Sequence, residues 1–190
     1  EGGSDSSAFD NVLELLVING VLSLPEAVMM MLPEAWQSNT NMEPEKKAWY
    51  EWAACLSEPW DGPALMTFSD GRYCGASLDR NGLRPCRYYK TNDGLMICAS
   101  EVGTIDIAPE RILEKGRLQP GKMLLVDTRE GRVVEDRELK MSIASRHNFR
   151  KWIDEQMLSL DEAVASSPKL DSIAALDHTP LTQDPRMLAF

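Results

Sequence analysis

Turn-forming residues divide residues 58–106 into short segments more densely than any other part of the chain. Asp70-Gly71 and Asn92-Asp93-Gly94 are each flanked by strand-like residues, which is the pattern of a β-hairpin, and Asn81-Gly82 lies between these two pairs. The four strand-like segments are residues 64–68, 73–78, 86–91 and 95–99. The sequence therefore predicts an antiparallel meander of about four strands, in which Asn81-Gly82 makes the middle reversal.

A second group of short segments follows this meander. A short helix is expected near residues 109–115. Pro120-Gly121 then leads into an apolar segment at residues 122–127, and a turn at residues 129–131 connects it to residues 132–134. These two segments predict a further pair of strands.

Helices are expected before the strands. Residues 4–7 form a helix-start cluster, and the apolar face that follows them at helical spacing ends at Asn19-Gly20. Ser23 is expected to cap a second helix, which runs through residues 27–32, is apolar all round and is therefore expected to be buried core. A third helix is expected over residues 44–56.

This order of elements indicates an α+β protein. The character of the chain changes from Asp136 onward. Residues 138–158 have a patchy apolar face that predicts one longer helix, and Ser-Pro and Thr-Pro breaks at residues 166–168 and 179–180 are typical of linkers. We therefore expect a division into residues 1–135 and residues 136–190.

Charge and hydropathy exclude several classes of function. A formal net charge of −10 disfavours binding to nucleic acid, because the chain and the phosphate backbone repel each other. The longest apolar run, residues 27–32, is far too short to span a membrane. Residues 1–5 have neither the basic nor the apolar part of a secretory signal.

The cysteines and histidines do not form a recognisable metal motif. The chain has four cysteines, none in a CxxC pair: Cys55, Cys74, Cys86 and Cys98. The last three lie in apolar strand segments and are expected to be buried small hydrophobes in a reducing compartment. With only His147 and His178 available, both a structural zinc site and a Ser-His-Asp triad are disfavoured.

Asp5 allows two interpretations. At the start of the first helix it is most readily interpreted as the N-cap. However, the helix dipole and the free N–H groups at this end also favour negative charge. A carboxylate held there could therefore receive a substrate ammonium group through charge-assisted hydrogen bonds.

Four strings of residues are more specific than these local patterns. They are Gly3-Ser4-Asp5-Ser6, residues 23–31 with 33–37, residues 58–64 with 70–72, and residues 78–85 with 99–103. In this order they resemble the later half of the class II glutamine amidotransferase domain in the large subunit of glutamate synthases. Residues 186–190 resemble the entry to the central domain of the same enzymes.

The resemblance implies a partial N-terminal-nucleophile hydrolase fold, an αββα sandwich with antiparallel sheets, followed by a C-terminal helix and linker. It implies that a cysteine splits glutamine and that the ammonia passes to 2-oxoglutarate to form glutamate. Asp5 matches the residue that receives the α-ammonium of glutamine, and Ser4 and Ser6 would help to shape this pocket. Because the sequence starts with Glu1, the nucleophilic cysteine is expected upstream, and no catalytic residue is assigned here. The isolated chain is therefore expected to be inactive.

The resemblance also implies cofactors and partners for the parent enzyme. These are FMN, an iron–sulfur cluster and either NAD(P)H with FAD or ferredoxin as electron source, none of them held by this chain. The expected partners are glutamine, the rest of the amidotransferase domain and the synthase domains, in the cytoplasm or a plastid, with no nucleic acid and no membrane. A non-enzymatic binding or interaction module on an amidotransferase-like scaffold stays open as the alternative.

Overall fold

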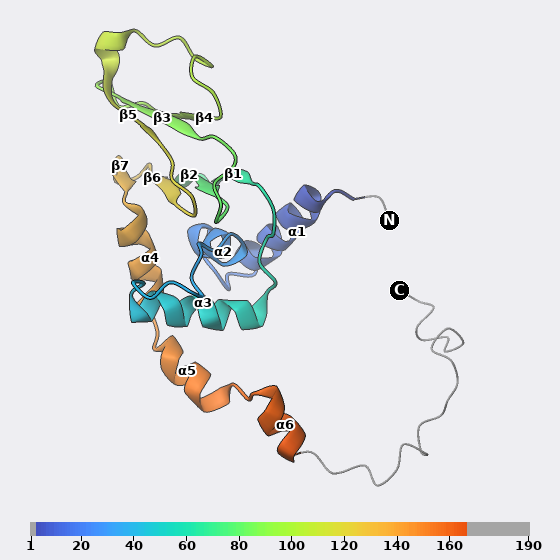
Figure 1. Cartoon of the computed structure of the whole chain (residues 1–190). Coiled ribbons are helices and arrows are strands. Elements are labelled where there is room, and N and C mark those ends of the chain that lie inside the picture. The colour runs from blue at the N-terminus through green and yellow to red at the C-terminus, as the bar shows by residue number, and fades with distance from the viewer. Residues whose placement is uncertain (1–2, 167–190) are drawn as a thin grey trace. The chain divides into compact units, whose positions relative to one another are not determined.

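The computed structural model describes residues 3–166, which fall into two compact units that meet between Glu155 and Gln156. The helices are α1 (Asp5–Ile18), α2 (Leu24–Met31), α3 (Pro44–Leu56), α4 (Asp136–Ala144), α5 (Phe149–Gln156) and α6 (Leu160–Ser166), and Pro109–Arg111 forms the 3-10 helix η1 (Figure 1). The strands are β1 (Leu65–Ser69), β2 (Tyr73–Leu78), β3 (Arg87–Thr91), β4 (Met96–Ala99), β5 (Ile112–Arg117), β6 (Met123–Asp127) and β7 (Arg132–Val134).

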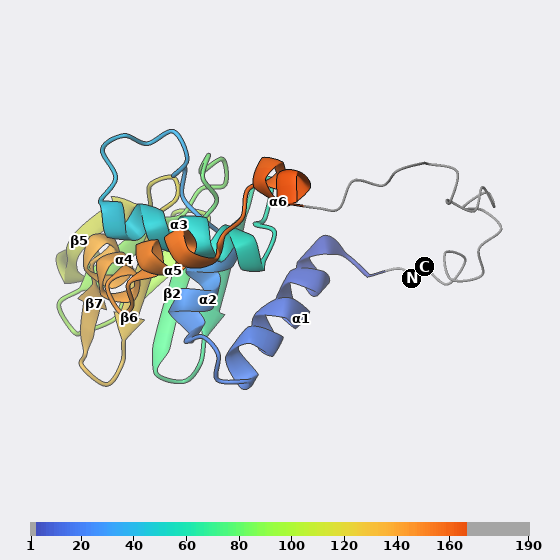
Figure 2. The same cartoon turned by 90° about the horizontal axis from the view of Figure 1, so that it is seen from below.

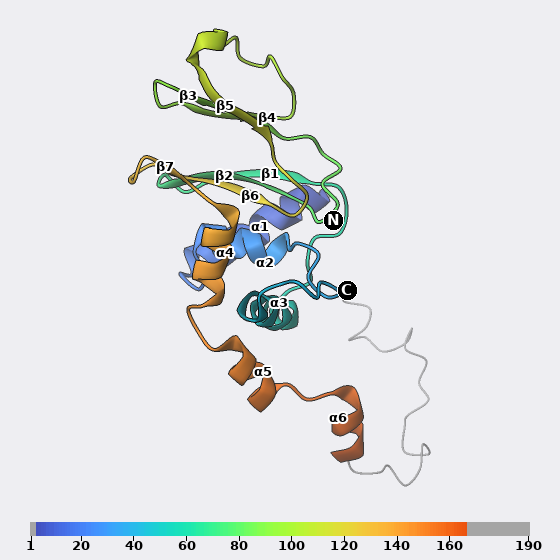
Figure 3. The same ribbon diagram turned by 60° about the vertical axis from the view of Figure 1, so that its left-hand side comes forward.

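The strands form two antiparallel sheets. The first has the order β1-β2-β6-β7 and the second the order β4-β3-β5. The second sheet lies over one face of the first, and α1, α2 and α4 cover the other face (Figure 3). Figure 2 looks onto this helical side, where α3 packs against both α2 and α4. The described residues therefore form a helical layer and two sheets, which confirms the expected α+β class and partial sandwich.

Strand β6 shows why the first sheet is apolar on both faces. Met123 and Leu125 point to the helical side, where the larger core contains Leu24 and residues 27–31 of α2. Leu124 points the other way, into the smaller core between the sheets. Because neighbouring residues of a strand face opposite sides, a strand buried on both faces reads as a continuous apolar run. The apolar α2 is buried core, as the sequence predicted.

Several local predictions are confirmed. Ser23 lies at the N-cap position of α2, where its hydroxyl donates to the Glu26 carboxylate at 3.4 Å and makes no capping bond to the backbone. Helix α3 has the expected bounds, residues 44–56. Asn19 is the C-cap of α1, and Gly20 follows with a φ of 66°, the left-handed conformation that ends many helices. Asp70-Gly71 connects β1 to β2, and the Asp70 carboxylate accepts hydrogen bonds from the Arg72 and Tyr73 N–H groups at 2.9 and 2.7 Å.

The predicted four-strand meander is wrong. Strands β2 and β3 do not pair, since β2 pairs with β6 at its second edge and β3 belongs to the other sheet. Asn81-Gly82 therefore turns the chain from one sheet to the other. The pairing of β2 with β6 joins residues about 50 positions apart, and turn residues carry no information about such a partner.

Two further predictions need correction. Only Pro109–Arg111 is helical in the region of residues 109–115, and β5 begins immediately afterwards because it pairs with β3. The long helix expected over residues 138–158 is two helices, α4 and α5. The second one starts because the side chain of Asn148 accepts a hydrogen bond from the Lys151 N–H at 3.0 Å, in the manner of an N-cap.

The unit that begins at Gln156 contains α6. Ser159 and Glu162 form a capping box there, with the Glu162 carboxylate accepting from the Ser159 N–H at 2.9 Å and the Ser159 hydroxyl from the Glu162 N–H at 3.2 Å. The linkers expected at residues 166–168 and 179–180 lie, apart from Ser166, outside the described residues. The division expected at residue 135 stays a prediction.

Candidate functional site

The start of α1 holds the three residues that the sequence singled out. Ser4 is the N-cap, and its Oγ accepts a hydrogen bond from the Ser7 N–H at 3.3 Å. The Ser7 hydroxyl donates to the Ser4 carbonyl oxygen at 2.8 Å, and the Ser4 and Ser6 hydroxyls are 3.0 Å apart. Asp5 is the first helical residue, so the interpretation of Asp5 as the cap is wrong by one position. The serine hydroxyl already serves the free N–H group of the first turn.

The carboxylate of Asp5 is exposed at the positive end of a 14-residue helix. Within residues 3–166 no cationic side chain pairs with it. Aligned peptide dipoles favour negative charge at this end of a helix. The geometry therefore leaves Asp5 accessible to a cationic group from outside the described residues.

A cavity of about 330 Å³ lies beside this helix start, between α1 and β1. Ser6 lines it, whereas Ser4 and Asp5 do not. The lining residues are Ser6, Ser7, Phe9, Asp10, Leu13, Val28, Met66, Thr67 and Phe68. Sequence analysis missed Asp10 and Thr67. The spacing of Ser6, Asp10 and Leu13 placed them on one helical face and could have revealed Asp10, whereas the approach of β1 is a tertiary contact.

Trp60 holds α1 in position. Its ring meets that of Phe9 edge to face with centroids 5.6 Å apart, and its backbone N–H donates to the Met31 carbonyl oxygen at 2.8 Å. The Trp60 indole N–H donates to the Gly62 carbonyl oxygen at 3.2 Å, which satisfies its polar edge. The string of residues 58–64 therefore anchors the helix that carries Ser4, Asp5 and Ser6.

Asp79 organises the string of residues 78–85. It is 4% exposed, and its carboxylate accepts three backbone hydrogen bonds, from Ala64 at 3.0 Å, Asn81 at 2.9 Å and Gly82 at 3.2 Å. The Ala64 bond fixes the residue that precedes β1. Asn81 and Gly82 therefore serve the turn between the sheets.

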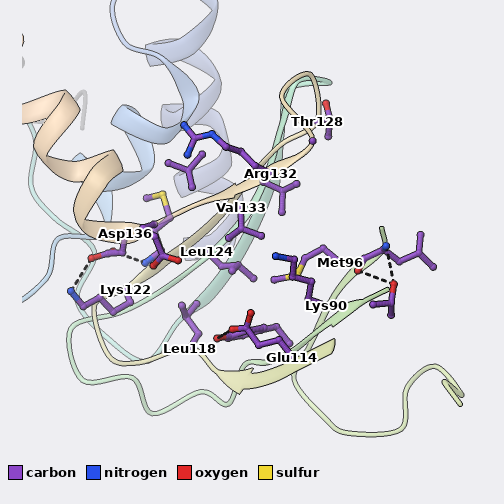
Figure 4. Close-up of a pocket in the computed structure, with 18 of the residues that line it drawn as sticks. Lys90, Met96, Glu114, Leu118, Lys122, Leu124, Thr128, Arg132, Val133 and Asp136 are labelled. Atoms are coloured by element: carbon purple, nitrogen blue, oxygen red, sulfur yellow. Dashed lines mark hydrogen bonds and ion pairs between the residues drawn. The ribbon is translucent and has the colours of Figure 1, made fainter. Parts of the chain in front are cut away.

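A larger cavity, of about 760 Å³, lies between the two sheets. Figure 4 shows apolar side chains from both sheets lining it, with Leu124 and Val133 on one sheet and Met96 on the other, and Lys122 paired with Asp136 at its edge. No cysteine, serine or histidine lines it. It therefore offers no cysteine thiol, and the start of α1 remains the better candidate site.

The acidic, histidine and cysteine side chains of the described residues do not form a metal site. No group of three or more His, Cys, Asp or Glu side chains within residues 3–166 could hold a metal ion. His147 stacks on Trp152 with ring centroids 5.1 Å apart, in an aromatic cluster on α3 and α5. The prediction that Cys74 is buried is wrong, because Cys74 is exposed at the end of β2 that faces the β1–β2 turn. Cys86 is buried and Cys98 is half-buried.

Comparison with known families supports the resemblance that the four strings of residues indicate. Residues 1–152 match the profile of the glutamine amidotransferases class-II. The chain belongs to this family. Among the described residues, none of the helices is long and apolar enough to cross a bilayer.

The chain is also similar to glutamate synthases. It is 62% identical over 192 residues to "Glutamate synthase [NADH]" of Schizosaccharomyces pombe, a match that covers 100% of the chain and 9% of that relative. It is 49% identical over 159 residues to "Glutamate synthase [NADPH] large chain" of Bacillus subtilis, covering 84% and 10%. It is 41% identical over 179 residues to the chloroplastic ferredoxin-dependent glutamate synthase of Oryza sativa, covering 92% and 11%. The chain thus spans about a tenth of the length of these curated relatives.

Proposed function

We propose that this chain is part of a glutamate synthase, which hydrolyses glutamine and passes the ammonia to 2-oxoglutarate to form glutamate. The observation that supports this most is the 62% identity to a glutamate synthase over the whole of the chain, which includes the Ser-Asp-Ser segment. Within this reaction the chain contributes to glutamine binding. The proposed location is a reducing compartment of the cytoplasm or a plastid.

Asp5 is proposed to receive the α-ammonium group of glutamine. Its carboxylate is accessible at the helix start, and a charge-assisted hydrogen bond from an ammonium group fits this position. Ser4 and Ser6 hold their hydroxyls 3.0 Å apart on either side of Asp5 in the sequence. In the proposed site these hydroxyls orient polar groups of the same substrate, and Ser6 does so from the wall of the 330 Å³ cavity.

The electron supply for the proposed reaction lies outside this chain. The names of these relatives specify NADH, NADPH or ferredoxin. Residues 3–166 offer no cluster of ligands for an iron–sulfur centre and no glycine pattern for a dinucleotide. We therefore assign no step of the redox half-reaction to residues of this chain.

The test compares two acid-to-amide variants of the full-length protein encoded by the gene. Asp5→Asn removes the proposed ammonium partner, and Glu14→Gln makes the same chemical change at an exposed position further along α1. A hydrogen bond to a charged group contributes about 1.5–3 kcal/mol, so kcat/KM for glutamine should fall roughly ten- to a hundredfold in Asp5→Asn. Glutamate formation supported by added ammonia should be unchanged, because it bypasses glutamine binding.

Equal kcat/KM values for glutamine in the two variants would contradict the role of Asp5. If the unaltered protein forms no glutamate from glutamine and 2-oxoglutarate with any of the three electron donors, the enzymatic proposal itself fails. The non-enzymatic binding module would then be the better interpretation.

A further inference from the structure

Two of the four cysteines lie side by side in the core between the sheets. The Sγ atoms of Cys86 and Cys98 are 2.9 Å apart, although the residues are 12 positions apart in the sequence. Cys86 immediately precedes β3, and Cys98 lies in β4 directly opposite Tyr88. Because Cys86 and Tyr88 are two residues apart, both sulfurs lie on the same face of the sheet, and both residues belong to the inter-sheet core.

The other two cysteines have no thiol partner. Cys55 is exposed on α3, and its thiol donates to the Glu51 carbonyl oxygen at 3.4 Å. Cys74 is exposed, with its sulfur 3.2 Å from the Ser69 hydroxyl. All four cysteines of the sequence lie within the described residues, so they provide an internal comparison between one close pair and two single thiols.

The pair is close to bonding distance. A disulfide bond is about 2.0 Å long, so the sulfurs need to approach by roughly 0.9 Å, which is within the reach of a side-chain rotation. The two thiols also differ in chemistry. The hydrogen bond between the two sulfurs holds the pKa of Cys98 below its ordinary value, and the same bond together with burial raises the pKa of Cys86. Cys98, half-buried, is therefore the more nucleophilic and the more accessible of the two.

We propose that Cys86 and Cys98 are a redox modification site, which forms a reversible intramolecular disulfide with a small-molecule disulfide such as oxidised glutathione. The Cys98 thiolate attacks one sulfur of the small molecule, which forms a mixed disulfide and releases one thiolate. Cys86 then loses its proton and attacks the Sγ atom of Cys98, which releases the second thiolate. In total two protein thiols lose two electrons and two protons, and the small-molecule disulfide is reduced to two thiols.

The disulfide would connect two loops that flank the pair. Cys86 ends the segment 79–86, which takes the chain from one sheet to the other, and Cys98 is one residue before the end of β4 and the loop that follows. Both loops carry an exposed apolar side chain, Leu83 and Val102, each 67% exposed. A covalent bond between their bases should restrict the opening of both loops. This inference is independent of the proposed reaction.

The primary test is differential alkylation of the full-length protein in a series of glutathione buffers. Tryptic cleavage places each cysteine on its own peptide, with Cys86 on residues 81–87 and Cys98 on residues 91–111. We expect these two peptides to lose their free thiols together at one midpoint and to appear as one disulfide-linked pair. Cys55 and Cys74 should not enter any link with them.

Two serine variants complete the test. In Cys98→Ser, Cys86 should stay free over the buffer range in which it is oxidised in the unaltered protein, whereas Cys74→Ser should leave the linked pair intact. Hydrogen exchange should slow in residues 79–86 and 99–103 when the pair is oxidised. The proposal is overturned if no linked pair appears in the unaltered protein in the most oxidising glutathione buffer. This outcome does not depend on the folding of any variant. The proposal is also overturned if Cys86 and Cys98 oxidise at separate midpoints.

Discussion

Lys140 is a buried cation whose contribution to the stability of the fold can be measured directly. Its side chain is 3% exposed, and its ammonium nitrogen lies 2.7 Å from the Gly121 carbonyl oxygen, 2.9 Å from an Asp136 oxygen and 3.1 Å from a Glu34 oxygen. These contacts connect α4 to the turn before β6 and to the segment after α2. Burial raises the pKa of Asp136, but the charges of Lys140 and Lys122 outweigh it and hold this pKa below its ordinary value.

Replacing Lys140 by methionine keeps most of the volume and removes the charge. Glu34 and Asp136 are then left as two partly buried carboxylates without their shared cation, and the Gly121 carbonyl oxygen loses its side-chain donor. Removing one partner of a buried ion pair costs about 3–5 kcal/mol. Both carboxylates keep other partners, so we expect a loss of about 3 kcal/mol, at the lower end of this range.

Hydrogen exchange in the full-length protein measures this loss locally. A loss of about 3 kcal/mol corresponds to exchange about a hundredfold faster in residues 121–127 and in α4. The matched control is Lys151→Met on α5, since Lys151 is 63% exposed and pairs with Glu155 at 3.7 Å. An exposed pair of this kind contributes at most about 0.5 kcal/mol to stability, so its loss should speed hydrogen exchange by no more than about twofold. Similar exchange in the two variants would refute the reasoning.

Two further predictions concern a turn and an ion pair. Gly82→Ala should lower the thermal midpoint clearly more than Gly94→Ala. Both glycines have positive φ, 60° and 86°, but a Cβ at Gly82 would lie 2.8 Å from the Cα of Pro120, whereas Gly94 faces open space; equal midpoints would contradict this. Arg72 is the main cause that lowers the pKa of Asp127 from 3.8 to about 2, so the stability from this pair is present above 3.8 and is lost as pH falls through about 2. As pH is lowered through this range, the thermal midpoint of Asp127→Asn should therefore fall less steeply than that of the unaltered protein. Parallel profiles of thermal midpoint against pH would exclude the Arg72–Asp127 pair as a cause of the acid sensitivity.

The sequence predicted those parts of the fold that neighbouring residues determine. The bounds of α3 and the Asp70-Gly71 turn are examples, because a helix start or a turn depends on a few adjacent backbone groups. The division of the strands into two sheets could not be predicted in this way. The hairpins β1–β2 and β3–β4 have the same local signal, and only the pairing with β6 and β5 places them in different sheets.

The same distinction applies to the candidate site. The residues of the Ser-Asp-Ser segment predict a helix start by themselves, and the structure places the segment at the start of α1 as expected. The role of Ser4 and Ser6 in a pocket was implied only by the resemblance. Which of its side chains lines the neighbouring cavity depends on where β1 lies, so Ser6 could not be separated from Asp5 beforehand. The proximity of Cys86 and Cys98 is similar, because it follows from the β3–β4 register and from the close approach of the two sulfurs.

Two of the strings of residues that resemble the amidotransferases fix the positions of β1 and α1, the two elements on either side of the cavity at the candidate site. Asp79 fixes the Ala64 N–H just before β1, and β1 supplies Met66, Thr67 and Phe68 to the cavity wall. Trp60 lies on the other side of this junction and packs against Phe9 of α1. The two strings therefore set the distance between β1 and α1, which is the width of the cavity that Ser6 faces. A chain with the Ser-Asp-Ser segment alone would have a carboxylate at a helix start, whereas the contacts of Asp79 and Trp60 add a cavity with a defined wall beside Ser6, the residue that follows Asp5.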